Sequence, residues 1–246
     1  MSALFFTNLI QGMPIHIALG RALRQKQMTM EKIVIIGASR GLGAKLSEKI
    51  AATHHVLGVA RKKDRLEDVA RRAGDNFTFL SADVTKDMEK IVGAVREFQP
   101  QRIFYVAAGG PHGLFARKAW KDHVWAWEVS FLAAAQLVHA VLGLDTPPHQ
   151  IILCGSAVAE SAGDPLGASY CSAKHALLGL HRTLRLEELI DLRLFSPGYL
   201  DTELLPKGAA IRYKGVWSPS IVADELWQWA QSKDHGGHRV CQLHPS

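Results

Sequence analysis

The 246-residue sequence has few of the residues that build cross-linked or metal-bound proteins. It contains three cysteines, Cys154, Cys171 and Cys241, which are too few for a disulfide framework or a zinc ligand set. Its 12 histidines show no ligand spacing either. We therefore predict no metal site and expect reduced thiols in a cytoplasmic protein.

The sequence also lacks the charge pattern of a nucleic-acid-binding protein. Its 29 basic and 23 acidic side chains give a net charge of +6, and no run of lysine and arginine alternates with aromatic residues. Half of the positive excess comes from Arg21, Arg24 and Lys26. We expect no nucleic-acid partner. A weak positive field favours an anionic small molecule, such as a phosphorylated cofactor.

Residues 1–20 contain no charged side chain. A membrane-spanning helix needs about 20 predominantly apolar residues, and polar residues, glycine and proline interrupt this stretch, so no membrane partner is predicted. A secretory signal begins with basic residues, which here come last. We interpret residues 1–30 as an N-terminal extension of unclear role with weak transit-peptide character. It either packs on the surface or precedes a true start at Met28 or Met30.

Residues 31–246 contain no repeat and no linker and are predicted to form a single domain. Short apolar runs there alternate with helically spaced segments. The predicted strands are 32–36, 56–60, 77–80, 103–107, 151–154, 192–195 and 239–243, and the predicted helices are 41–53, 64–73, 88–98, 120–144, 170–190 and 221–230. This alternation predicts an α/β fold, a Rossmann-type doubly wound parallel sheet with helices on both faces. A ligand is expected at the carboxyl ends of the strands.

A glycine-rich turn joins the first predicted strand to the first predicted helix. It reads Gly37-Ala38-Ser39-Arg40-Gly41-Leu42-Gly43. Glycine allows a tight turn and a close approach of phosphate to the backbone, and the start of a helix offers free N–H groups and a positive dipole end. The turn therefore predicts a phosphate-binding site in this strand–turn–helix context.

The same turn also matches G-x-S-x-G, the pattern that carries the nucleophile of serine hydrolases. Ser39 would then be the nucleophile, with His235 or His238 as its base. The turn follows the first clear strand, and no glycine loop precedes it to supply an oxyanion hole. A serine hydrolase is therefore a remote alternative.

A basic residue follows the second predicted strand. A cofactor with a free ribose 2′-hydroxyl favours a carboxylate at this place, whereas a 2′-phosphate favours arginine. Arg61 stands there, and Arg40 lies in the glycine turn. Guanidinium binds phosphate through several donors, so the pair predicts NADP, with NADPH preferred over NADH. Alternatively, Arg61 only begins the basic surface run of residues 61–63.

A tyrosine and a lysine lie four residues apart at the start of the predicted helix 170–190. Tyr170 and Lys174 therefore share one helix face. A phenol has a pKa of about 10, and a nearby ammonium group lowers that pKa and prepares the phenol for acid–base catalysis. Ser156, after the fifth predicted strand, could hold a carbonyl oxygen. The Tyr–Lys pair alone is frequent by chance, but its order after the glycine turn and Ser156 is not.

Together these motifs resemble the short-chain dehydrogenase/reductase family over about residues 31–243. The resemblance implies that the glycine turn holds the cofactor pyrophosphate, that Asp83 contacts the adenine, and that the Pro197–Thr202 segment lies against the nicotinamide. The cofactor-binding residues implied in this way are Gly37, Ser39, Arg40, Gly41, Leu42, Gly43, Arg61, Asp83, Val84, Ala107, Ala108, Gly109, Lys174, Pro197, Gly198 and Thr202.

The resemblance also implies the catalytic roles. Ser156 would orient a substrate carbonyl, Tyr170 would donate the proton, and Lys174 would bind the nicotinamide ribose and lower the tyrosine pKa. The implied activity is NADPH-dependent reduction of a small-molecule carbonyl to an alcohol, or the reverse. The family often pairs its long helices between subunits, so a homodimer or homotetramer is expected.

The chain departs from the family pattern at several positions. Val106 and Ala107 stand where the family usually has asparagine before Ala-Gly, and Ile36 replaces a threonine. Ser130 replaces a helix-borne asparagine that supports a water relay to the lysine, and we expect its hydroxyl to hold that water as a fourth catalytic group. A catalytically weak NADP-binding sensor or regulatory protein is therefore the main alternative.

Three further side chains are considered near the substrate. Trp217 and Tyr213 belong to the short segment 203–218, which predicts a small lid, and we expect both to line the substrate pocket. His112 faces the predicted cleft, although a loop position on the surface is the simpler interpretation. No feature of the sequence identifies the substrate.

Overall fold

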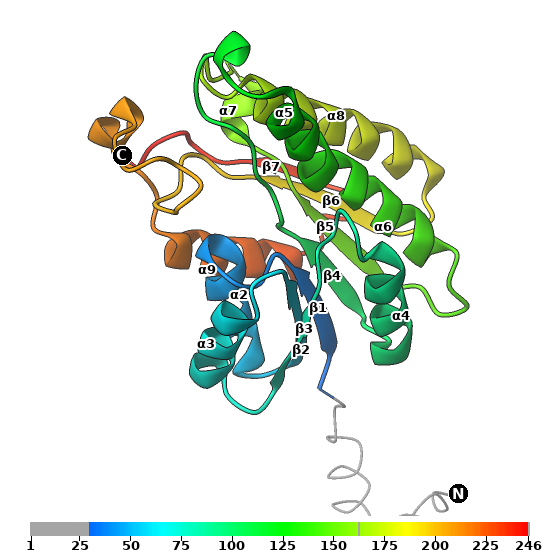
Figure 1. Cartoon of the computed structure of the whole chain (residues 1–246). Helices are drawn as coiled ribbons and strands as arrows, with labels where there is room; N and C mark the ends of the chain where they lie inside the picture. Colours follow the sequence, from blue (N-terminus) through cyan, green and yellow to red (C-terminus); the bar gives the residue numbers. More distant parts are fainter. Residues whose placement is uncertain (1–29, 162, 246) are drawn as a thin grey trace, which may run out of the picture. The chain divides into compact units, whose positions relative to one another are not determined.

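A seven-stranded parallel sheet forms the centre of the fold (Figure 1). The computed structural model describes residues 30–161 and 163–245, so the predicted extension lies outside the described residues except for Met30. The strand order is β3-β2-β1-β4-β5-β6-β7, which confirms the doubly wound parallel sheet. The strands are β1 (Lys32–Ile36), β2 (His55–Ala60), β3 (Phe77–Ser81), β4 (Arg102–Tyr105), β5 (Gln150–Cys154), β6 (Asp191–Ser196) and β7 (His238–Val240).

Helices cover both faces of this sheet (Figure 1). The helices are α2 (Gly41–Ala51), α3 (Lys63–Ala73), α4 (Met88–Phe98), α5 (Trp120–Trp127), α6 (Ala133–Leu142), α7 (Ala157–Glu160), α8 (Ala168–Leu184) and α9 (Pro219–Ala230). Successive side chains of a strand point to opposite faces, so Ile33 and Ile35 of β1 pack under α2, α3 and α9, whereas Val34 and Ile36 pack under α4, α6 and α8. Single 3-10 turns form η1 (Phe115–Arg117), η3 (Arg185–Glu187) and η4 (Ala210–Lys214).

The predicted helix 120–144 is not continuous. A π turn, η2 (Glu128–Leu132), separates α5 from α6, and the N–H of Ala133 bonds to the carbonyl of Glu128. The buried hydroxyl of Tyr105 donates to the carbonyl of Val129 at 2.7 Å. A buried phenol needs a partner, and the widened turn supplies one. The predicted helix 170–190 is also shorter, since α8 ends at Leu184.

One helical stretch, Trp120–Leu142, is apolar and long enough to cross a membrane by these two criteria alone. Its buried side chains, among them Ala134, Leu137 and Val141, pack against the sheet. The core helix of a globular protein meets the same criteria, so this stretch is weak support for a membrane span.

A buried ion pair stabilises β6, the strand that leads into the Pro197–Gly198 segment. Arg193 is fully buried, and its guanidinium donates to the Asp191 carboxylate at 3.0 Å and to the carbonyl oxygens of Trp229 and Ser232. Burial acts to raise the pKa of Asp191, but hydrogen bonds from Arg193 and the Gly236 N–H outweigh burial and hold that pKa below its ordinary value.

Replacing Arg193 with Met is expected to lower the free energy of unfolding by about 3–5 kcal/mol, because it removes the guanidinium that pairs with the buried Asp191 carboxylate. The pKa of Asp191 is lowered in the folded state, so the pair stabilises the fold above the unfolded pKa of about 4 and loses that contribution as the pH falls through the folded value. Urea titrations at neutral and acid pH should show the deficit shrinking in acid. Arg239→Met, in an exposed pair with Glu225, is the control, and a deficit independent of pH contradicts the assignment.

Candidate active site

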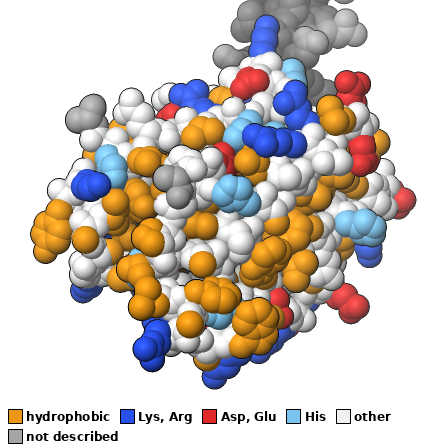
Figure 2. Space-filling view, turned by 90° about the horizontal axis from the view of Figure 1, so that it is seen from above, with side chains coloured by type: hydrophobic (Ala, Val, Ile, Leu, Met, Phe, Trp, Pro, Cys, Tyr) orange, Lys and Arg blue, Asp and Glu red, His pale blue; other side chains and the backbone are white. Residues whose placement is uncertain are grey.

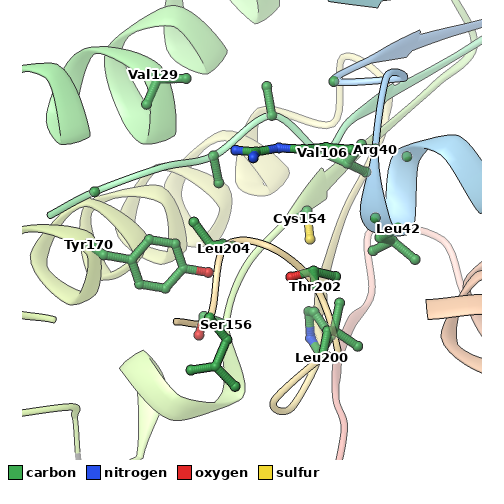
Figure 3. Close-up of a pocket in the computed structure, with 18 of the residues that line it drawn as sticks. Arg40, Leu42, Val106, Val129, Cys154, Ser156, Tyr170, Leu200, Thr202 and Leu204 are labelled. Atoms are coloured by element: carbon green, nitrogen blue, oxygen red, sulfur yellow. The ribbon is translucent and has the colours of Figure 1, made fainter. Parts of the chain in front are cut away.

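A cavity of about 340 Å³ lies along the carboxyl ends of β1, β4, β5 and β6 (Figure 3). The chain crosses from one side of β1 to the other here, which is where α/β sheets bind ligands. The cavity brings together most of the predicted site residues. Those that line it are Gly37, Ser39, Arg40, Gly41, Leu42, Gly43, Arg61, Val84, Ala107, Ala108, Ser156, Tyr170, Lys174, Pro197, Gly198 and Thr202.

The glycine turn forms one wall of the cavity. Gly37 has a φ of +98°, and a Cβ at this position would lie 2.7 Å from the backbone nitrogen of Ala107. α2 begins at Gly41 with Arg40 at its N-cap, without a side-chain cap and without an acidic residue in its first turn. The N–H groups of Gly37 and Ala38 donate to the Val59 carbonyl, whereas those at the start of α2 have no side-chain cap and can bind an anion, which the helix dipole favours.

Basic side chains gather at one end of the cavity. Arg40, Arg61, Lys62 and Arg65 all line it. Arg40 and Arg65 bind one carboxylate, that of Glu203, at 2.9 and 2.8 Å, and these hydrogen bonds hold the pKa of Glu203 below its ordinary value. Guanidinium groups that converge on a carboxylate also match a phosphate. Lys62 and Arg65 were not predicted, although both lie close to Arg61 at the start of α3.

Arg61 is held beside this group by the residues around it. Its guanidinium lies over the ring of Trp125 at 5.3 Å and 3.7 Å from the Asp83 carboxylate. The Asp83 carboxylate accepts hydrogen bonds from the N–H and hydroxyl of Thr85, at 3.0 and 2.9 Å. Asp83 itself is not among the lining residues, whereas Val84 is. The structure therefore does not bring the predicted adenine contact into the cavity.

The other end of the cavity carries the hydroxyl pair. Figure 3 shows the hydroxyl of Tyr170 pointing toward Ser156. Ser156 is the N-cap of α7, and its oxygen accepts from the N–H of Ala159 at 3.4 Å. Burial raises the pKa of Tyr170, and a hydrogen bond with Ser156 opposes this. The phenol therefore keeps its proton at neutral pH, as a proton donor must.

Lys174 lies beneath this pair. It is 1% exposed, and its Nζ donates to the carbonyl of Cys154 at 2.6 Å. Nζ lies 5.6 Å from the ring centre of Tyr170. Burial lowers the pKa of Lys174. The sequence predicts that the lysine lowers the pKa of Tyr170, but in the structure burial dominates and the lowering contribution comes from Ser156.

Comparison with known proteins agrees with this geometry. A model of the short chain dehydrogenase family matches residues 31–210. The chain belongs to the short-chain dehydrogenase/reductase family. It is 34% identical over 191 residues to an uncharacterized oxidoreductase of Mycobacterium tuberculosis, which covers 74% of this chain and 72% of the relative.

Solved structures of similar proteins share the fold. BdcA in complex with NADPH superposes with a TM-score of 0.75 at 20% identity, over 85% of this chain and 92% of BdcA. A 3-ketoacyl-(acyl-carrier-protein) reductase from Brucella melitensis complexed with NADH gives a TM-score of 0.74 at 19% identity, over 87% of this chain and 97% of the reductase. The shared fold therefore occurs in proteins that bind either nicotinamide cofactor.

Ser130 does not line the cavity of this short-chain dehydrogenase/reductase. It lies in the π turn and is fully buried. Its hydroxyl donates to the carbonyl of Gly109 at 3.0 Å and accepts from the N–H of Gly109 at 3.1 Å. Ser130 and Gly109 therefore satisfy each other, and neither is brought to the site as predicted. Within the π turn, Val129 lines the cavity instead.

The segment after β6 lines the cavity with residues other than those predicted. Trp217 donates to the carbonyl of Gln242, and Tyr213 is 94% exposed, so the prediction that both line the cavity is wrong. Tyr199, Leu200, Leu204 and Leu205 line it instead, and His112 does so from the β4 side. Arg212 holds the segment together through Asp201 and the carbonyl oxygens of Thr202, Leu205 and Pro206.

The geometry gives little support to a serine hydrolase in this family member. The positive φ values of the glycine turn belong to Gly37 and Gly41 rather than to Ser39. The nominated bases pair elsewhere, His235 with Asp191 and His238 with Glu160. Within residues 30–161 and 163–245, no hydrogen bond joins Ser39 to a histidine, and no three His, Cys, Asp or Glu side chains are placed to hold a metal ion.

Proposed function

We propose that this chain is an NADP-dependent oxidoreductase that reduces a small-molecule carbonyl to an alcohol, or catalyses the reverse, with Ser156, Tyr170 and Lys174 as its catalytic residues. The observation that carries the proposal is the arrangement of the cavity. The Tyr170 hydroxyl faces Ser156 at one end (Figure 3), and the arginines Arg40, Arg61 and Arg65 line the other. Membership of an oxidoreductase family supports this reaction class.

The lining fits a phosphorylated nicotinamide cofactor. The glycine turn presents bare backbone, the first turn of α2 offers uncapped N–H groups, and Arg40, Arg61 and Arg65 would hold a 2′-phosphate. Lys174 donates one N–H to the Cys154 carbonyl, and its other N–H groups are available to a ribose hydroxyl. These arginines, rather than the fold, support a preference for NADPH over NADH.

The catalytic residues act on the carbonyl oxygen. When bound, NADPH supplies the hydride. Ser156 donates a hydrogen bond to the carbonyl oxygen and holds it beside Tyr170, and the protonated phenol of Tyr170 gives its proton to the alkoxide oxygen as the alcohol forms. Lys174 lies on the same helix face, with Nζ 5.6 Å from the ring centre of Tyr170, and the hydrogen bond with Ser156 favours the phenolate that remains.

A second candidate function is a cofactor-binding protein with weak catalysis, acting as a sensor or regulator. One observation favours it. The Ser130 hydroxyl bonds to Gly109 and lies outside the cavity lining, so it is not placed to hold water next to Lys174. A sensor would bind NADPH tightly and consume none of it with any carbonyl compound.

We also propose a homodimer or homotetramer in the cytoplasm. Apolar side chains remain exposed on η1, α5 and η2, chiefly Phe115, Trp120, Val124, Trp127 and Leu132. Figure 2 shows orange side chains spread over the face of the molecule that is seen from above. Exposed apolar patches are typical of subunit contacts.

The three cysteines are free thiols, which supports the proposed location in the cytoplasm, a reducing compartment.

The proposed cofactor preference predicts the outcome of a fluorescence titration. NADPH should bind saturably and at least about tenfold more tightly than NADH, because one lost charge-assisted contact costs about 1.5–3 kcal/mol. Displacement of bound NADPH by NADH measures the ratio directly. Equal affinities contradict the role of the arginines, and absence of binding contradicts the cofactor site as a whole.

A further inference from the structure

A buried carboxylate lies directly beneath the turn that carries Ser156. Glu160 ends α7, the short helix that Ser156 caps, and its side chain is only 6% exposed. Its Oε1 accepts a hydrogen bond from the hydroxyl of Ser196, at the end of β6, and lies 3.5 Å from the N–H nitrogen of Ser156. One carboxylate oxygen is therefore shared between the catalytic serine backbone and the neighbouring strand.

The second oxygen of Glu160 faces a histidine on the edge strand. Oε2 lies 2.8 Å from Nε2 of His238, in β7. This contact is electrostatic rather than an aligned hydrogen bond, since Oε2 has no hydrogen-bond donor among the described residues. With a proton on Nε2, His238 donates to Ser196 Oγ at 3.2 Å, and Ser196 donates to Glu160. Ser196 therefore directs its proton to Oε1, whereas His238 directs its proton to Ser196 Oγ and lies close to Oε2.

Gly155 leaves the room that this arrangement needs. A Cβ on Gly155 would lie 2.2 Å from Ser196 Oγ and 2.8 Å from Glu160 Oε1. The residues around Ser156 are also hydrogen-bonded to the chain at and after β6, through Gly155 N–H to the Phe195 carbonyl at 2.8 Å and Ala157 N–H to the Pro197 carbonyl at 2.9 Å. The carboxylate thus fills the space between the serine turn and the strand to which the turn is bound.

This cluster is not a second hydrolytic centre. The hydroxyl of Ser196 is fully buried, so no substrate can reach it. One nitrogen of His238, Nε2, contacts both Ser196 and Glu160. A histidine that relays a proton needs one ring nitrogen for the serine and the other for the acid. The arrangement can fix a position, but it cannot activate a nucleophile.

Glu160 also acts on the charges of the site. Burial lowers the pKa of Lys174, and the charge of the Glu160 carboxylate is among the effects that oppose this. A buried carboxylate is costly unless it is paired, and exchanging such a pair for apolar side chains is often neutral or stabilising. Stability of the fold is therefore a weak explanation for a buried carboxylate at position 160. The contacts of Glu160 with Ser156 and Ser196 are a stronger explanation.

We propose that Glu160, fixed by Ser196 and His238, is a positioning residue that holds the Ser156 turn with its hydroxyl facing Tyr170. This inference rests on the proposed function, because that function gives Ser156 the task of holding the carbonyl oxygen. Glu160 does not touch substrate or cofactor. It acts through the backbone of Ser156 and through the α7 turn.

The test compares Glu160→Gln with Glu225→Gln in the full chain. The amide of the new glutamine would place an N–H group against the Nε2 proton of His238. The attraction between the carboxylate and His238 would then be lost. Glu225 of α9 pairs with Arg239, the residue after His238 in β7, and serves as the matched control. With NADPH and a panel of activated aldehydes and α-diketones, Glu160→Gln should lower kcat by about 10- to 100-fold, because small displacements of catalytic groups have effects of this size. The Kd for NADPH should change less than about twofold, and Glu225→Gln should match wild type.

Amide hydrogen exchange supplies a readout that does not need activity. In Glu160→Gln, but not in Glu225→Gln, exchange should accelerate at residues 155–161 and stay unchanged in β1 and α2. A wild-type kcat in Glu160→Gln, or unchanged exchange at residues 155–161, overturns the proposal. If wild type turns over none of the carbonyl probes, the proposed function fails, and the exchange data alone decide this inference. If Glu160→Gln does not fold, the same two measurements on His238→Gln decide it.

Discussion

Tyr170→Phe is expected to lower NADPH-dependent carbonyl turnover by about 100- to 10 000-fold, the usual contribution of a general acid. The substitution removes the hydroxyl that faces Ser156 and keeps the ring. Because no part of the glycine turn or the arginine cluster changes, the Kd for NADPH should stay within about twofold of wild type. Steady-state kcat and a fluorescence titration measure the two quantities.

Tyr213→Phe is the matched control for this prediction. It makes the same chemical change at a tyrosine that is 94% exposed and absent from the cavity lining. Its kcat should equal that of wild type. If Tyr170→Phe also retained full turnover, Tyr170 would not be the proton donor, and the mechanism would have to be abandoned.

Arg61→Ala is expected to weaken NADPH binding by about 10- to 100-fold and to leave NADH binding unchanged. Removing a guanidinium from a phosphate costs about 1.5–3 kcal/mol, the range measured for hydrogen bonds to charged groups. NADH has no 2′-phosphate, so it loses nothing. The ratio of the two Kd values, measured at constant ionic strength, reports the effect.

Arg71→Ala provides the comparison for Arg61→Ala. Arg71 lies on α3, pairs with Asp68 and does not line the cavity. It should leave both Kd values unchanged, which separates a specific phosphate contact from a general loss of positive charge. If Arg61→Ala weakened NADPH and NADH equally, the arginine would act on a part of the cofactor that both share.

The parts of the fold and site that were predicted correctly depend on short-range patterns. Apolar runs bounded by glycine predict buried strands, and the turn that begins at Gly37 sits between a strand and a helix in both sequence and structure. A spacing of four residues places Tyr170 and Lys174 on one helix face whatever surrounds them. Such features need no knowledge of the rest of the chain.

The predictions that differ from the structure depend on contacts between distant segments. The hydroxyl of Tyr105 donates a hydrogen bond to the π turn at 128–132, and the hydroxyl of Ser130 is hydrogen-bonded to Gly109. At Asp83 the competing contact is local instead. Its carboxylate accepts a hydrogen bond from the Thr85 hydroxyl, and this bond competes with the adenine contact that the resemblance implies. Sequence patterns do not reveal which of two available partners a polar side chain will choose.

The pairing of Glu160 with His238 shows why part of the site could not be foreseen. The two residues lie on a helix and a strand far apart in the chain, and each alone is an ordinary polar residue. Only the sheet order, with β7 beside β6, brings them together beneath Ser156. The sequence signal that could have raised the question is Gly155, a residue without a side chain immediately before the catalytic serine.

The transfer of hydride tests the central claim most directly. Wild-type protein would be incubated with NADPH carrying deuterium at both C4 positions of the nicotinamide and with the carbonyl panel, and the alcohol products would be analysed by mass spectrometry. The account predicts deuterium in an alcohol product with wild type and its near absence with Tyr170→Phe. Saturating binding of NADPH without deuterium in any product would contradict an NADPH-dependent carbonyl reductase and would favour a cofactor-binding regulator.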